Sequence, residues 1–321
     1  EFRRVLFRSL QALYTGEVRA EGIDLKFVIN DEPRDIFNRM LARQEYDVAE
    51  MSTSDFIARR SVEGDQCPMV GLPVFPSRMF RHSFITYNAA SGIRSPRDLE
   101  GRRIGVPRYS MTAAVWMRGL LQHDYGVDVS TIRWVEGAIN KPGPHGDPPL
   151  LPLLRDIPIE ANDAGKSLAD SLEAGRIDAL LGTQLPLAIH RNPSIRRLFP
   201  NYPQDEKAYF RRTGLYPMMH MVAIRRDVYE ANPSIAGSLF RAFEEAKQVA
   251  LRHMRHQAAL RYMLPWMNAE MEEMKDLFGD DPYPYGVEAN RHALETMMGY
   301  MTEQGIIARP VPVEALFAPL D

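Results

Sequence analysis

The chain has 321 residues, of which 45% are hydrophobic, with a formal net charge of -3 and a pI of about 6.3. A chain of this length can bury two separate hydrophobic cores. The sequence has no basic domain or basic stripe, which a protein that binds nucleic acid usually shows. The single Cys67 excludes an internal disulfide, and no run approaches the roughly 20 apolar residues of a membrane span.

The first nine residues, EFRRVLFRS, resemble the translation of a sequencing-library adapter. We therefore leave residues 1–9 out of the fold prediction as foreign sequence. We expect the native N-terminus to be missing here, so a secretion signal is neither predicted nor excluded.

Strands and helices alternate from residue 23 onward. Ile23–Ile29 alternates and is β-branched, which predicts a strand, and the apolar spacing of Pro33–Gln44 predicts a helix. Tyr46–Met51 is a short predicted strand. Residues 52–54 are Ser, Thr and Ser, and a helix is predicted from Asp55. Hydroxyls at a helix start cap it or bind an anion.

A second helix start carries the same signal. Arg81–Asn88 predicts a strand that begins with an Arg-His pair. Arg102–Val106 predicts another strand, and Met111–Tyr125 predicts a helix that Gly126 ends. Arg, Tyr and Ser at positions 108–110 precede that helix, whose first N–H groups lack intrahelical partners. This turn is therefore suited to hold a small anion.

The second half of the chain continues the alternation after a proline-rich loop. Prolines between residues 142 and 158 are too dense for a helix or a central strand. The expected strands are Thr131–Glu136, Ile177–Leu181 and Met218–Ile224, and the expected helices are Ser167–Ala174, residues 233–264 and residues 286–302.

This order predicts an α/β fold with mostly parallel sheets flanked by helices. In such sheets ligands bind at the carboxyl ends of the strands. The loops expected there are Ser52–Ser54, Arg108–Thr112, Glu136–Asn140 and Gly182–Thr183.

The extended segments 83–88 and 217–224 are interpreted as two crossings between domains. Residues 10–88 and 217–321 would then form domain one, and residues 89–216 an inserted domain two.

Cofactor motifs are missing from the sequence. There is no G-x-G-x-x-G fingerprint, and Gly165-Lys166-Ser167 lacks the upstream glycine of a phosphate-binding loop. No H-E-x-x-H pair or G-x-S-x-G elbow occurs. We predict no cofactor and no metal.

Polar side chains at the predicted cleft edges suit a small organic acid. Arginine binds carboxylates with two parallel hydrogen bonds, and histidine exchanges protons near neutral pH. Taken singly, each of these residues is compatible with a surface charge or a satisfied core group, and their clustering at the predicted cleft edges favours a site. The candidates are Arg78, Arg81, His82, Tyr109, Ser110, Thr112, Glu136, Tyr216 and His220.

Long runs stand in the order EGIDLKF, YDVAEMS, LPVFPSRMFRHS, GRRIGVPRYSMTAAVWMRG, RRTGLYPMMHMVAIRRDVY, FEEAK and PYGVEANRHALE. In these runs, from about residue 16 to the C-terminus, the chain resembles the 4,5-dihydroxyphthalate decarboxylase family. The resemblance implies a two-domain fold like the type II periplasmic binding proteins, with two interdomain crossings. Residues 1–9 stand where the family has its first strand and the loop after it.

The resemblance also implies a carboxy-lyase that converts 4,5-dihydroxyphthalate to protocatechuate and CO₂ without a redox cofactor. Each carboxylate has a ring hydroxyl para to it. A base at that hydroxyl, an acid at the ring carbon and a clamp for the retained carboxylate would then be required.

From the residue chemistry we assign these roles as hypotheses. Arg81 is the predicted carboxylate clamp, and the helix start at Ser110–Thr112 is a second anion contact. His82 and His220 are the acid/base candidates, with Glu136 as a weaker one. Further predicted substrate contacts are Arg78, Ser52, Ser54, Tyr109, Thr183 and Tyr216, with Met111 and Trp116 as an apolar wall.

Two alternatives remain open. The chain is also compatible with a transporter's solute-binding protein for a small organic anion, because that fold is shared, or with a related decarboxylase for another aromatic acid. We expect a small aromatic dicarboxylate as ligand and a cytoplasmic location, or a periplasmic one for the solute-binding alternative. A homo-oligomer is compatible with the sequence.

Overall fold

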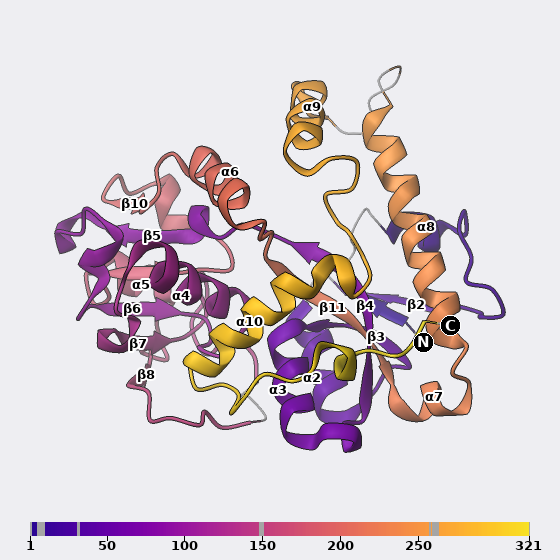
Figure 1. Cartoon of the computed structure of the whole chain (residues 1–321). Coiled ribbons are helices and arrows are strands. Elements are labelled where there is room, and N and C mark those ends of the chain that lie inside the picture. Colours follow the sequence, from indigo (N-terminus) through magenta and orange to yellow (C-terminus); the bar gives the residue numbers. More distant parts are fainter. Residues whose placement is uncertain are drawn as a thin grey trace.

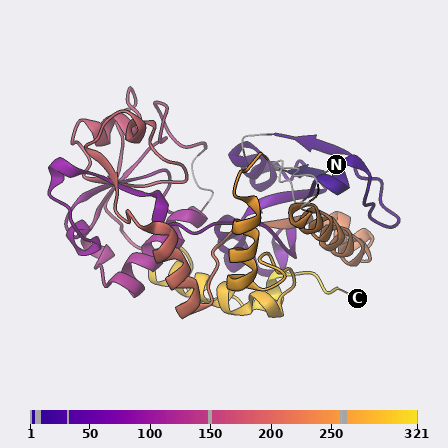
Figure 2. The ribbon, with the colours of Figure 1, turned by 90° about the horizontal axis from the view of Figure 1, so that it is seen from above.

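The structure, a computed structural model, describes residues 2–4, 10–30, 33–147, 151–256, 258 and 263–320. Two sheets of five and six strands, each covered by helices, lie side by side (Figures 1 and 2). We call the part built on the five-stranded sheet lobe one and the part built on the six-stranded sheet lobe two.

Lobe one contains both parallel and antiparallel strand pairs. Strand β1 pairs in parallel with β2 and β3, whereas β11 is antiparallel to β3 and β4. In sheet order the strands are β2 (Phe27–Ile29), β1 (Phe2–Arg4), β3 (Val48–Ser52), β11 (Met218–Arg225) and β4 (Met69–Arg78). The helices are α1 (Gln11–Thr15), α2 (Pro33–Arg43), α3 (Thr53–Glu63), α7 (Arg226–Ala231), α8 (Ile235–Arg255) and α9 (Met267–Phe278).

The burial of β3 explains how this sheet is covered. All five of its residues are buried. Ala49 and Met51 pack in the core that includes α2 and α3, while Val48 packs in the core that includes α1 and α8. Successive side chains of a strand point to opposite faces, so helices must cover both faces of this sheet.

Lobe two has its parallel strands at one side of the sheet. Strands β9, β6, β7 and β8 pair in parallel, and β5 pairs antiparallel with β9 and β10. In sheet order they are β10 (Ile195–Arg197), β5 (Ile85–Asn88), β9 (Ala179–Leu181), β6 (Arg103–Val106), β7 (Arg133–Glu136) and β8 (Ile159–Ala161). The helices are α4 (Thr112–Tyr125), α5 (Leu168–Glu173) and α6 (Tyr202–Thr213), and α10 (Arg291–Glu303) returns to pack on α4.

The predicted α/β class, with helices flanking mostly parallel sheets, is confirmed. Helix α4 ends at Gly126, whose φ of 65° lies in the left-handed region that glycine adopts without strain. Among the described residues, no helix has both the length and the apolar character needed to cross a membrane.

Several boundaries differ from the sequence predictions. Strand β5 begins only at Ile85, because His82–Phe84 form a 3-10 turn, η3. Since β5 lies in the lobe two sheet and β11 in the lobe one sheet, the chain crosses at residues 79–84 rather than 83–88, and again just before Met218. The helix expected over 233–264 ends at Arg255, and a separate helix, α9, follows.

Residues 2–4, which we excluded from the fold prediction, form strand β1. They pair with Phe27–Ile29 on one side and with Val48 and Ala49 on the other. Strand pairing uses backbone groups, so a short segment of any compatible sequence can satisfy the N–H and C=O groups of β2 and β3.

Candidate functional site

The strand ends of both lobes meet at one interlobe seam. Helices α2 and α3 follow the carboxyl ends of β2 and β3 in lobe one, and α4 follows the end of β6 in lobe two. The carboxyl ends of parallel strands are where open α/β sheets bind ligands. Hydrogen bonds between residues 52–54 and 110–112 join the two edges directly.

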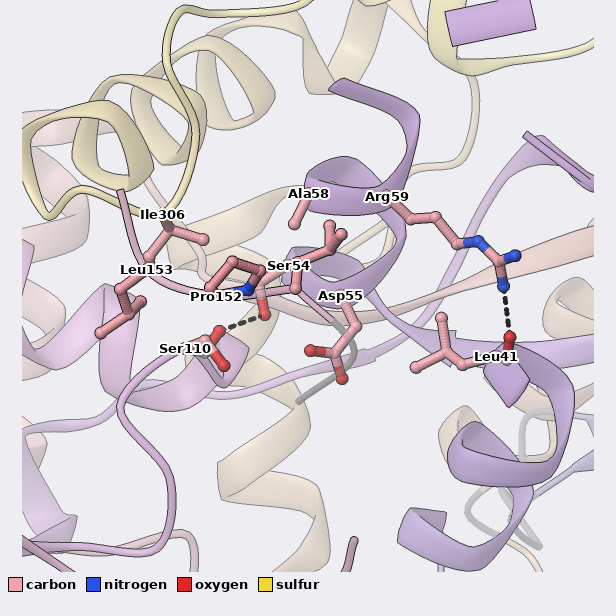
Figure 3. A pocket seen from close by; sticks show the side chains of 10 residues that line it. Leu41, Ser54, Asp55, Ala58, Arg59, Ser110, Pro152, Leu153 and Ile306 are labelled. Carbon is pink, nitrogen blue, oxygen red and sulfur yellow. Dashed lines mark hydrogen bonds between the residues drawn. The ribbon is translucent and has the colours of Figure 1, made fainter. Parts of the chain in front are cut away.

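Three buried hydroxyl side chains form a cluster at this seam: Ser52, Ser54 and Thr112. The Thr112 Oγ1 lies 3.1 Å from both serine Oγ atoms and accepts a hydrogen bond of 3.0 Å from the Ser54 backbone N–H. The Ser54 hydroxyl donates to the Ser110 carbonyl at 2.8 Å (Figure 3). We call these three residues the hydroxyl cluster. It brings the N-termini of α3 and α4 together, and helix N-termini favour anions.

An acid/base pair lies beside the hydroxyl cluster. His220 on β11 is the direct cross-strand partner of Ser52 on β3. Its Nδ1 is hydrogen-bonded to the carboxylate of Glu50, which is only 1% exposed, and the ring of Phe37 packs edge-on at 4.8 Å. A carboxylate at Nδ1 favours the tautomer with hydrogen on that nitrogen, which makes Nε2 the atom that exchanges protons.

Sequence reasoning missed Glu50. The signal was present, because Glu50 is a carboxylate inside a strand predicted to be buried, and a buried charge requires a partner. The partner itself could not be read from the sequence, since His220 lies 170 residues further on.

A small cavity lies beside the hydroxyl cluster (Figure 3). It is lined by Ser54, Asp55 and Ser110, with Leu153 and Ile306 as apolar wall, and its volume is about 30 Å³. That is room for about one water molecule. A wider groove of about 560 Å³ opens between α2 and residues 138–147. This second volume falls in the range of small-molecule sites.

Arg81 lies in the crossing between the lobes, between β4 and β5. It is buried, and its Nε and Nη2 donate to the sulfur of Met219 at 3.2 and 2.6 Å. Burial lowers the pKa of the guanidinium to about 10, so it remains charged. Its role as carboxylate clamp stays a prediction.

His82 lies in the same crossing and is 1% exposed among aromatic rings. Phe199, Tyr209 and Tyr125 pack edge-on at 5.1, 5.4 and 6.0 Å, and the Glu206 carboxylate is 4.0 Å away. Within the described residues, neither ring nitrogen has a hydrogen-bond partner. Burial, with a smaller contribution from the positive charge of a nearby arginine, lowers the pKa of His82 to about 4.

Replacing His82 with Phe is expected to reduce the loss of unfolding free energy that the protein shows between pH 7 and pH 5. The unfolded histidine binds a proton below its usual pKa of about 6.5, whereas the folded one does so only near 4, so stability falls as pH drops through this window. We expect the wild type to lose about 2 kcal/mol from this group between pH 7 and pH 5. Urea unfolding of both proteins at the two pH values measures the difference; equal losses would contradict it.

Further candidates lie in or near α4 or after β9. Glu136 accepts from the Tyr109 N–H at 2.5 Å, and the Trp116 indole donates to the Met218 carbonyl at 2.9 Å. These contacts fix the turn before α4 and the helix itself. Met111 is the N-cap residue of α4, and Thr183 is half-buried after β9.

Arg78 and Tyr216 belong to a different cluster, at the end of β4. Arg78 donates to the carbonyls of Tyr216 and Pro284 at 3.0 and 3.1 Å and to the side chain of Asn290. The Tyr216 hydroxyl lies 3.1 Å from that of Tyr283. In the described part of the chain, no group of three or more His, Cys, Asp or Glu side chains is arranged to hold a metal ion.

Comparison with known proteins places the chain in a family. The family model described as NMT1/THI5 like matches residues 12–141. The 4,5-dihydroxyphthalate decarboxylase of Comamonas testosteroni is 32% identical over 98% of this chain and 94% of that protein. The protein of the same name from Pseudomonas putida is 36% identical over 55% of this chain and 67% of its own length.

A solved structure supports the fold independently. The periplasmic aliphatic sulphonate binding protein SsuA from Escherichia coli aligns with a TM-score of 0.54 over 99% of this chain and 96% of that protein, at 12% identity. The two-lobed fold expected from the resemblance is thereby confirmed. Given its near full-length match to the Comamonas protein, the chain belongs to the 4,5-dihydroxyphthalate decarboxylase family.

Proposed function

We propose that this protein converts 4,5-dihydroxyphthalate to 3,4-dihydroxybenzoate and CO₂ at the interlobe seam. The observation that carries the proposal is the pairing of His220 with buried Glu50 directly across the strand from Ser52. A proton donor then stands next to a site that favours an anion. The two relatives named as this decarboxylase support the same reaction.

Binding comes first in the proposed mechanism. A carboxylate of the substrate takes hydrogen bonds from the hydroxyl cluster and from the first-turn N–H groups of α3 and α4. Charge-assisted hydrogen bonds of this kind are about twice as strong as neutral ones. Because Ser52 and Thr112 come from different lobes, one carboxylate can hold both lobes together.

Proton transfer follows. Solvent water takes the proton from the hydroxyl para to the leaving carboxylate, which raises electron density at the carbon bearing that carboxylate. His220 Nε2 donates a proton to that carbon, the C–C bond breaks, its electron pair restores the aromatic ring, and CO₂ leaves. The hydrogen bond from Nδ1 to the Glu50 carboxylate orients the ring for this transfer. Reprotonation of the phenolate and of His220 completes the cycle, with one proton consumed overall.

The solute-binding alternative rests on the fold shared with the sulphonate binding protein, and fold alone does not define function. The decisive comparison is between 4,5-dihydroxyphthalate and phthalate, which lacks the hydroxyls. We expect repeated turnover of the first to 3,4-dihydroxybenzoate, and binding without turnover of the second. Tight binding of both with no product would contradict the decarboxylase and support a binding protein.

We further propose that the two lobes are the two domains, with the first boundary near residue 84 rather than 88. The ligand is a small aromatic dicarboxylate, no nucleic acid is involved, and the protein works in the cytoplasm. Light scattering after size exclusion measures whether a homo-oligomer forms.

A further inference from the structure

We propose that Arg108 and Arg34 form a second carboxylate subsite across the seam, so that the site selects a dicarboxylate over a monocarboxylate. This inference deepens the proposed function and rests on it for the identity of the substrate. The two arginines come from different lobes, and sequence reasoning assigned neither of them a role.

One face of α2 lies toward the seam. Arg34 at the start of this helix donates from Nη1 to Asp55 at 2.7 Å, and its buried Nε has no hydrogen-bond partner in the part of the chain that the structure describes. Phe37, three residues after Arg34, packs against His220. Asn38, four residues after Arg34, donates to the Asp147 carboxylate of lobe two at 3.1 Å. Residues three and four apart share a helix face. Arg34 therefore faces the same space as the acid/base pair.

Arg108 approaches this space from lobe two. It lies between β6 and α4, four residues before Thr112, and is 5% exposed. Its Nη2 donates to the carbonyl of His145 at 3.2 Å, a neutral acceptor. Burial lowers the pKa of Arg108 to about 10, with Arg34 the next contribution in the same direction, and the side chain remains a cation. A buried cation gains most from a carboxylate as partner.

Cationic and anionic side chains both lie around this space. Burial first, and then the charges of Arg34 and Arg108, lowers the pKa of His145 to about 4, which indicates that the groups around this imidazole are predominantly positive. The carboxylates of Asp55 and Asp147 are already hydrogen-bonded to side chains of α2. The carboxylates of Asp55, Glu136 and Asp147 also lie near Arg108. A ligand carboxylate would therefore join these groups as a further partner of the two guanidinium groups.

The groove that Arg34 lines has the size for such a ligand. Its volume of about 560 Å³ is bounded by Arg34 and Asn38 on α2 and by His145 on the loop after β7. Ortho carboxylates on one ring lie side by side. Arg108 lies four residues before Thr112, in the segment between β6 and α4. In this proposal the first carboxylate occupies the hydroxyl cluster while the second meets the guanidinium groups.

Calorimetry with two unreactive probes, phthalate and benzoate, tests the subsite. We expect the wild type to bind phthalate more tightly, and Arg108→Gln to weaken phthalate binding by about 10–100-fold with little effect on benzoate. Arg108→Lys should retain part of the preference, because the charge stays. The matched control is Arg103→Gln, an exposed arginine on β6 that pairs with Glu160 and should leave the ratio unchanged.

Two outcomes overturn the inference: a wild type that does not distinguish the probes, or an Arg108→Gln protein that folds and keeps the wild-type ratio. If Arg108→Gln does not fold, the ratio of phthalate to benzoate affinity is measured for Arg34→Gln instead. We expect this variant to lose the preference for phthalate, and a wild-type ratio would overturn the inference. The decarboxylase is judged separately by turnover. If the wild type prefers phthalate but turns over no 4,5-dihydroxyphthalate, the decarboxylase proposal is wrong and the subsite stands. If it turns over 4,5-dihydroxyphthalate but Arg108→Gln keeps the wild-type ratio of phthalate to benzoate affinity, the subsite is wrong and the decarboxylase stands.

Discussion

Replacing His220 with Gln is expected to lower kcat for 4,5-dihydroxyphthalate by about 10²–10⁴-fold, the usual contribution of a positioned proton donor. Glutamine can still donate a hydrogen bond to Glu50, so the buried carboxylate keeps a partner, but it exchanges no proton. We therefore expect phthalate affinity within a few-fold of wild type. Steady-state assays and calorimetry on the same preparations measure the two quantities.

A second histidine provides the control for this substitution. His190 is exposed on a 3-10 turn of lobe two, so His190→Gln should leave kcat unchanged. A His220→Gln protein with wild-type kcat would remove this residue from the mechanism, and an equal loss of phthalate affinity would mean that it binds rather than protonates.

Replacing Thr112 with Val is expected to raise KM by about 10–100-fold, with a smaller change in kcat. Valine has nearly the same shape, so the packing of α4 is retained. The Ser54 N–H, however, loses its acceptor, and the two serine hydroxyls lose their common partner. An unsatisfied buried group costs about 1–3 kcal/mol, and the ligand also loses a donor.

The control for Thr112→Val is Thr296→Val on α10. The Thr296 hydroxyl donates to the carbonyl of His292 within its own helix, so its removal should not change KM. If Thr112→Val binds 4,5-dihydroxyphthalate and phthalate as the wild type does, the ligand does not use the hydroxyl cluster.

Local patterns pointed to the three residues of the hydroxyl cluster and to His220, but not to Glu50. Ser52, Ser54 and Thr112 were visible because a strand followed by Ser or Thr and then a helical repeat is a local signal. Their convergence follows from the general rule that strand ends form the ligand edge. The contact of Glu50 with His220 depends on how β3 and β11 pair, which no local pattern determines.

The Arg81–His82 pair was placed by residue type, and its functional roles stay predictions. A basic pair at the start of a predicted strand suggested the cleft edge, but the strand begins at Ile85 and the pair lies in the crossing between lobes. There Arg81 contacts Met219, and His82 packs among aromatic rings. Whether a polar residue faces a cleft or a core depends on the path of the chain between sheets, and that path is not encoded in residue type.

A crystal structure of His220→Gln with bound 4,5-dihydroxyphthalate tests most directly whether the interlobe seam is the site of reaction. We expect one carboxylate at the hydroxyl cluster, the other near Arg108 and Arg34, and the substituted side chain at position 220 facing the ring. A ligand bound elsewhere, such as in the groove between α6 and α9, with the seam closed, would contradict the account.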